Sequence, residues 1–359
     1  MFSDNIYSLI FLFQFQKLIE VHALENLSTP IVLWHGMGDS CCNPLSLGRI
    51  VKVLKKELGS NTYVKSLKIG KSIEQDIANG FFKNVNVQVK DVCNQISTDP
   101  YLQNGYNAIG FSQGAQFLRA VAQRCPNPPM INLISIGGQH QGVFGMPRCL
   151  YQNHKWCEYV RQLLNKDAYV SWIQDSFVQA EYWHDPIKEN DYISRSYFLA
   201  DINNERTNNK IYRDNLLKLK NFVLIMFAND TMVIPKESSW FAFYSPGQDI
   251  KIMPLEQSTL YLLDRIGLKE LEETGRLHFL AIPGDHLKFT EDWFINWWSD
   301  GSCYATSRRT LRSGQAMAYA SVVITILQYT GSSKLKVERA IAYTSVVIII
   351  YLPYLNIYN

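Results

Sequence analysis

The sequence lacks the features that identify nucleic-acid-binding and zinc-binding proteins. Its 359 residues carry a net charge of only +3, and no stretch forms a basic patch. Six basic and two acidic residues follow residue 298, so the rest of the chain is close to neutral. Histidine and cysteine do not occur at zinc-ligand spacing. We therefore expect no nucleic-acid partner, no metal and no other cofactor.

The composition is that of a folded enzyme with a large core. Hydrophobic residues make up 47% of the chain and aromatic residues 13%. Segments typical of strands alternate with segments typical of helices, which favours an α/β fold with a mainly parallel sheet.

One motif indicates a nucleophile. Residues 110–114 read Gly-Phe-Ser-Gln-Gly, between a strand-like segment at 106–109 and a helix-like segment at 115–122. A strand, a sharp turn and a helix form the context of a nucleophile elbow, in which glycines make room for the turn. We expect Ser112 to be the nucleophile, whereas the alternative is a plain glycine-rich turn.

The base should follow the serine in the chain and lie at the end of a strand. His286 meets both conditions because it follows the strand predicted at 276–282. His278 lies inside that strand and is expected in the core. His154 and His184 lie in a polar middle region and are expected to be surface or cap residues.

The acid should also lie at the end of a strand. The most strand-like segment between Ser112 and His286 is 221–228, and Asp230 follows it. The alternative for Asp230 is a local turn cap. Asp285 and Asp201 are weaker candidates, the first because it is adjacent to the histidine and the second because no clear strand precedes it.

An acyl-transfer site needs backbone N–H donors for the oxyanion. Gln113, directly after the nucleophile, is the first candidate. The strand predicted at 30–34 opens into a glycine-containing loop at 35–39, which makes Met37 the second. His35 precedes Ser112 in the chain, so we interpret it as a loop-packing residue.

Several unusual segments together resemble the palmitoyl-protein thioesterases of the lysosomal type. The similarity extends over about residues 30–293 and is strongest at 35–44, 110–114, 122–126, 136–143, 179–186 and 284–287. It implies an α/β-hydrolase fold, with a mainly parallel central sheet flanked by helices and a cofactor-free triad of Ser112, Asp230 and His286. It also places the oxyanion donors at Met37 and Gln113. The chain departs from the family at Ala115, where glycine is expected, and at Ile234, where an acidic residue is usual.

Within a hydrolase domain at 24–298, residues 142–219 change in character. They are rich in tyrosine, tryptophan, asparagine and lysine, and strand-like segments stop there. We expect a helical cap insertion that forms an acyl groove. Its aromatic residues could instead fill a second small core.

The two ends of the chain differ from the rest. Residues 1–23 are predicted to be a signal peptide, although no Lys or Arg precedes the apolar segment at 6–13 and a buried first helix is the alternative. Residues 299–359 form a divergent or aberrant tail in which 316–326 recurs as 340–350. These repeats give no firm evidence for a membrane span.

Cysteines and sequons suggest the secretory pathway. Six cysteines precede the tail, and the sequence alone allows fifteen pairings. The family resemblance implies the pairs Cys41–Cys42, Cys93–Cys125 and Cys149–Cys157. Sequons occur at Asn26 and Asn229. We expect a glycosylated protein of the lysosome, with secretion as a second destination.

The resemblance predicts a serine hydrolase that cleaves long-chain fatty-acyl (palmitoyl) thioesters from cysteines through an acyl-serine intermediate. Its partners would be fatty-acylated proteins or peptides, and we expect a monomer. One alternative is an oxygen-ester lipase of the same fold. Another is a non-catalytic acyl-binding glycoprotein.

Overall fold

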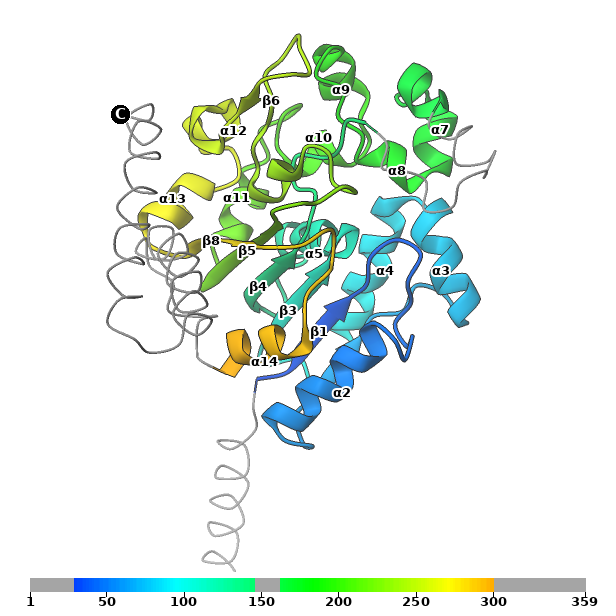
Figure 1. The fold of residues 1–359 in the computed structure, drawn as a ribbon, viewed down its shortest axis with the longest axis vertical. Coiled ribbons are helices and arrows are strands. Elements are labelled where there is room, and N and C mark those ends of the chain that lie inside the picture. The colour runs from blue at the N-terminus through cyan, green and yellow to red at the C-terminus, as the bar shows by residue number, and fades with distance from the viewer. Residues whose placement is uncertain (1–28, 146–161, 300–359) are drawn as a thin grey trace, which may run out of the picture. The chain divides into compact units, whose positions relative to one another are not determined.

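A six-stranded parallel sheet forms the centre of the computed structural model, which describes residues 29–145 and 162–299 (Figure 1). The strands lie in the order β2-β1-β3-β4-β5-β8, and each neighbouring pair is parallel. Their bounds are β1 (Ile31–Trp34), β2 (Val64–Ser66), β3 (Tyr106–Phe111), β4 (Met130–Ile136), β5 (Asn221–Phe227) and β8 (Leu277–Ile282). The predicted α/β fold with a parallel sheet is confirmed.

The central strands are apolar on both faces because helices cover both. Every residue of β1, β3 and β5 is buried, as is typical of parallel sheets. Four strands expected from the sequence, at 30–34, 106–109, 221–228 and 276–282, are present with their ends shifted by at most two residues.

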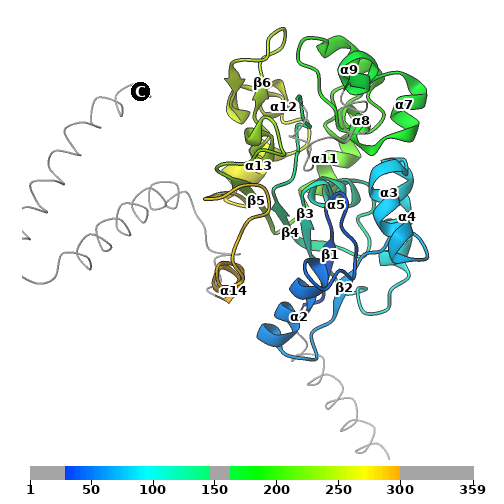
Figure 2. The same cartoon turned by 45° about the vertical axis from the view of Figure 1, so that its right-hand side comes forward.

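Two helical layers enclose the sheet (Figure 2). On one face, Leu33 packs in the same core cluster as Leu54 of α2 (Leu47–Leu58) and Phe294 of α14 (Glu291–Ser299). On the other face, Val32 packs in a cluster with Phe117 of α5. That layer contains α4 (Val85–Ser97), α5 (Gln113–Arg124) and α11 (Lys210–Leu216), with α3 (Ile73–Phe82) nearby.

Short helices fill the chain between β4 and β5. They lie at the top of Figure 1 and are α7 (Ser171–Ser176), α8 (Val178–Glu181), α9 (Glu189–Arg195) and α10 (Leu199–Ile202). Trp183, Tyr192 and Phe198 from this region are fully buried and belong to the cluster that covers the sheet. The aromatic residues therefore extend the main core and do not form a separate one.

The remaining elements connect β5 to β8. They are η1 (Lys236–Trp240), the hairpin of β6 (Phe243–Tyr244) and β7 (Ile252–Met253), η2 (Leu255–Gln257), α12 (Thr259–Leu262) and α13 (Leu268–Glu273). In the described ranges, no helix is both long enough and apolar enough to span a bilayer.

Two of the three implied disulfides are present, Cys41–Cys42 and Cys93–Cys125. The third, Cys149–Cys157, lies outside the described residues. So do the predicted signal peptide, the sequon at Asn26 and all but the first residue of the tail at 299–359.

Candidate active site

Ser112 lies at the turn between β3 and α5 with an unusual backbone conformation. Its φ is 53° and its ψ is −126°, a region that non-glycine residues occupy at a cost of about 1–3 kcal/mol. The flanking glycines allow this turn. A Cβ at Gly110 would lie 2.2 Å from the Cα of Ala115, and one at Gly114 would lie 2.5 Å from the carbonyl oxygen of His35.

His286 and Asp230 complete a hydrogen-bonded chain to this serine. The Nε2 of His286 is 2.9 Å from the Oγ of Ser112, and its Nδ1 is 2.7 Å from Oδ2 of Asp230. Both residues follow adjacent strands, β8 and β5, at the carboxyl edge of the sheet. This geometry can transfer the hydroxyl proton to an imidazole that a carboxylate orients.

The Asp230 carboxylate is held on both oxygens. Its side chain is fully buried, and Oδ1 accepts hydrogen bonds from the backbone N–H groups of Met232 and Val233. Oδ2 therefore faces the imidazole of His286. A rotation that exchanged the two oxygens would break the hydrogen bonds from Met232 and Val233.

Asp285 does not contact the imidazole. Its Oδ1 accepts hydrogen bonds from the amide and hydroxyl of Thr231 and from the amide of His286. The bond from the His286 amide, followed by those from Thr231, keeps the pKa of Asp285 below its ordinary value. Asp285 thus links the loop of Asp230 to the loop of His286.

The other residues weighed from the sequence lie away from the serine. Asp201 pairs with Arg124, and His278 is buried with its Nε2 2.9 Å from Oδ1 of Asn221. The expected surface or cap position is wrong for His184, which is buried between the rings of Tyr192 and Phe243. His154 lies outside the described residues.

The loop after β1 lies close to Ser112. A Cβ at Gly36 would lie 3.1 Å from the Cβ of Ser112, so the glycine allows the loop to pass close to the serine, and Met37 lines the same pocket as Ser112. Gln113 is the first residue of α5. The N–H groups at a helix start have no intrahelical partner and favour nearby negative charge.

The sequence of this chain matches the family described as palmitoyl protein thioesterase over residues 30–286. The chain is 55% identical to palmitoyl-protein thioesterase 1 of Caenorhabditis elegans over 267 residues, which are 74% of this chain and 89% of that protein. The chain belongs to the palmitoyl protein thioesterase family. Palmitoyl-protein thioesterase 3 of Dictyostelium discoideum is 39% identical, over 74% of this chain and 87% of its own. Mouse lysosomal thioesterase PPT2 is 33% identical, over 48% of this chain and 56% of its own.

This thioesterase accommodates both departures from the expected family pattern. Ala115 is fully buried, and a Cβ at Gly138 would lie 2.8 Å from its methyl group, so Ala115 packs directly against a glycine. Ile234 is half-buried, and its carbonyl accepts a hydrogen bond from the amide of Phe144. Neither residue takes part in the hydrogen-bonded chain of Ser112.

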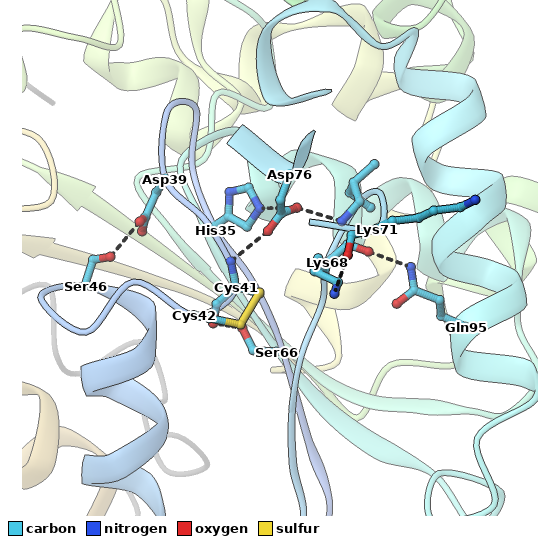
Figure 3. Close-up of a disulfide and its surroundings, with 11 residues drawn as sticks. His35, Asp39, Cys41, Cys42, Ser46, Ser66, Lys68, Lys71, Asp76 and Gln95 are labelled. Carbon is cyan, nitrogen blue, oxygen red and sulfur yellow. Dashed lines mark hydrogen bonds and ion pairs between the residues drawn. A yellow bond between two sulfur atoms is a disulfide. The ribbon is translucent and has the colours of Figure 1, made fainter. Parts of the chain in front are cut away.

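A buried acid–base pair supports the loop after β1 (Figure 3). The Nε2 of His35 is 3.1 Å from Oδ1 of Asp76, which lies on α3, and Oδ2 of Asp76 accepts a hydrogen bond from the amide of Cys41. Asp76 also accepts a hydrogen bond from the amide of Ile69. The sequence indicated that His35 packs in the loop, but nothing in it pointed to Asp76.

The two pKa values shift in opposite directions. Burial alone would lower the pKa of His35, but the hydrogen bond and negative charge of Asp76 outweigh burial and raise it above 6.5. Burial alone would raise the pKa of Asp76, but its bond to His35 and its backbone donors hold it below 3.8. Each partner therefore favours the charged form of the other.

A pocket of about 440 Å³ opens at Ser112, a size typical of small-molecule sites. Residues 142–219 supply four of its lining residues, Val143, Gln179, Tyr182 and Trp183. Another side of the pocket was not predicted from the sequence, and it comes from α2 with its preceding loop and from the segment after His286. That wall includes Leu45, Leu47, Ile50, Val53, Leu287 and Phe289. Apolar residues at helical spacing in 47–58 were the available signal.

Asn229 is exposed, one residue before the buried Asp230. The side chain of Asn229 is therefore accessible, as glycosylation at this sequon requires. Its glycosylation stays a prediction. No cluster of potential metal ligands occurs among the described residues.

Proposed function

We propose that this thioesterase removes long-chain fatty-acyl groups, such as palmitoyl, from cysteine thioesters of proteins or peptides. The observation that carries the proposal is the hydrogen-bonded chain from Ser112 through His286 to Asp230 at an apolar pocket. The names of the curated relatives support palmitoyl-proteins as the substrate class.

In the first half-reaction, Ser112 is the nucleophile. Its Oγ attacks the thioester carbonyl carbon while Nε2 of His286 takes the hydroxyl proton. Asp230 holds Nδ1 protonated and stabilises the imidazolium that forms. The tetrahedral intermediate then collapses, the C–S bond breaks, and His286 returns the proton to the leaving thiolate.

The negative charge of the intermediate needs donors already in place. We assign this role to the N–H groups of Met37, which lines the pocket with Ser112, and of Gln113, which is at the start of α5. Donors of this kind typically contribute about 3 kcal/mol each to transition-state stabilisation.

In the second half-reaction, water replaces the thiol. His286 takes a proton from water, the hydroxide attacks the acyl-serine carbonyl, and Ser112 leaves with the proton that His286 returns. This step releases the fatty acid and regenerates the hydroxyl of Ser112. Every proton transfer uses groups of the protein and water. No cofactor is needed.

The same protein family bears on the subcellular location and the oligomeric state that we propose for this chain. The curated relatives named lysosomal thioesterases support the lysosome, with secretion as a second destination. The two disulfides and the exposed sequon at Asn229 support passage through an oxidising, glycosylating compartment. We expect a monomer that acts on fatty-acylated proteins or peptides.

The test is hydrolysis of a palmitoyl-cysteine peptide by wild type and by Ser112→Ala. Loss of the nucleophile should lower kcat by roughly a million-fold with the fold intact. Ser194→Ala is the matched control, because this serine is exposed on α9 and bonds only to its own helix. Substantial turnover by Ser112→Ala would refute the nucleophile, and faster cleavage of the matching oxygen ester would favour a lipase.

A further inference from the structure

The walls of the pocket belong to two different parts of the core. Tyr182 and Trp183 pack in the cluster that joins the cap helices to one face of the sheet. Leu47 and Phe289 pack in the cluster between the other face and the helices α2 and α14. Ser112 lies at the carboxyl edge of the sheet, between the two sets. The pocket therefore has two sides at Ser112, and we call the first, lined by Val143, Gln179, Tyr182 and Trp183, the cap arm.

We call the second of these the α2–α14 arm. It is lined by Leu45, Leu47, Ile50, Val53, Leu287 and Phe289. Leu45 at its rim is 87% exposed, although the loop that carries it is well ordered by hydrogen bonds. The amide of Leu45 donates to Oδ1 of Asn43, and the hydroxyl of Ser46 donates to Asp39.

An ion pair joins the two walls of this arm. Arg49 of α2 binds Glu291 of α14 through its Nε, at 2.9 Å, and through a second guanidinium nitrogen. Both residues line the pocket. The arm is thus a preformed apolar surface with a polar rim.

The position of the general acid indicates what the arm binds. The leaving sulfur must lie at Nε2 of His286 to receive its proton, and Leu287 and Phe289 follow that histidine in the chain. On the cap side, the side-chain amide of Gln179 donates to the sulfur of Met37 at 2.8 Å. The leaving group therefore lies on the side of the α2–α14 arm, and the acyl chain lies in the cap arm.

We propose that the α2–α14 arm is a subsite for the thiol portion of the substrate, and that it binds an apolar side chain adjacent to the acylated cysteine. This inference rests on the proposed thioesterase mechanism. It makes the enzyme selective for the peptide as well as for the acyl group.

Three substrates that share the palmitoyl group test this subsite. One is the thioester of N-acetylcysteamine, the second a peptide with leucine on both sides of the acyl-cysteine, and the third the same peptide with serine in those places. Wild type should prefer the leucine peptide over the serine peptide by about tenfold in kcat/KM, the gain expected from partial burial of leucine. Leu45→Ser and Ile50→Ser should each reduce that ratio toward one.

Leu263→Ser is the matched control, since Leu263 is also exposed, at 65%, and does not line the pocket. It should retain the wild-type ratio. Equal rates of wild type on the two peptides would overturn the subsite. So would a Leu45→Ser variant and an Ile50→Ser variant that both keep the wild-type preference for the leucine peptide, because the arm would then not contact the peptide. A wild type inactive on all three thioesters, including the N-acetylcysteamine one, would overturn the proposed function itself.

Discussion

The two neighbouring carboxylates of the site have different tasks because their partners differ. Asp230 is buried, anchored by two backbone amides through one oxygen and directed at Nδ1 of His286 through the other. Asp285 is partly exposed and bonds to Thr231 and to a backbone amide. Only the first can orient the imidazole.

Replacement of each carboxylate by its amide should separate these tasks. Asp230→Asn should lower kcat by about four orders of magnitude, because the amide would favour the tautomer with Nε2 protonated. Asp285→Asn should cost less than about tenfold, since it weakens only the bond between two loops. Steady-state kinetics on one palmitoyl thioester would measure both. A larger loss for Asp285→Asn would mean that the wrong carboxylate has been assigned.

At the scale of elements, α3 fixes the loop after β1 through a single buried side chain. Asp76 connects His35, Ile69 and the amide of Cys41, so it holds both ends of the loop that contains Met37. The contribution of the pair depends on pH. The raised pKa of His35 adds stability below its ordinary value of 6.5, and this is lost as pH rises through the raised value. The lowered pKa of Asp76 adds stability above 3.8, and this is lost as pH falls.

The pair should therefore stabilise the fold most in mildly acidic solution. Asp76→Asn should lower the free energy of unfolding by about 3 kcal/mol at pH 5, and by less at pH 8. Denaturant titrations at the two pH values would measure this. Asp91→Asn is the control, because its pair with Lys83 is partly exposed to solvent, unlike the buried pair of Asp76, and should contribute under about 1 kcal/mol at either pH. An equal loss for Asp76→Asn at both pH values would contradict the charged pair.

At the scale of the whole domain, the sheet places the nucleophile between a helical insertion and the layer of α2 and α14. Residues 142–219 contribute one side of the pocket, and helices far away in sequence contribute the other. An apolar pocket of this size selects ligands by the apolar area that they bury.

Activity should consequently rise with acyl length. Each methylene buried in the pocket contributes roughly 0.8 kcal/mol, or up to about fourfold in kcat/KM. A series of thioesters of one small thiol, from butanoyl to palmitoyl and measured below their micelle concentrations, would show a rise and then a plateau when the pocket is full. A flat series would remove the reason to regard the enzyme as specific for long chains.

The sequence could predict the local parts of the site. A strand-like segment, Gly-x-Ser-x-Gly and a helix-like segment are contiguous, so their geometry follows from backbone sterics over a few residues. The strand preceding Asp230 and the strand preceding His286 are also continuous apolar segments. In a parallel sheet, their carboxyl ends meet at one edge.

The rest depended on contacts between segments far apart in the chain. The sequence by itself determined four of the six strands, the serine turn and the candidates for acid and base, because each rests on local pattern and chain order. Only the tertiary structure decided how each carboxylate points, because side-chain direction is set by partners such as the amides of Met232 and Val233. It alone joined Asp76 to His35, 41 residues earlier, and brought α2 beside the segment after His286 to form the second arm. Such contacts arise from packing against a shared core, which local periodicity does not encode.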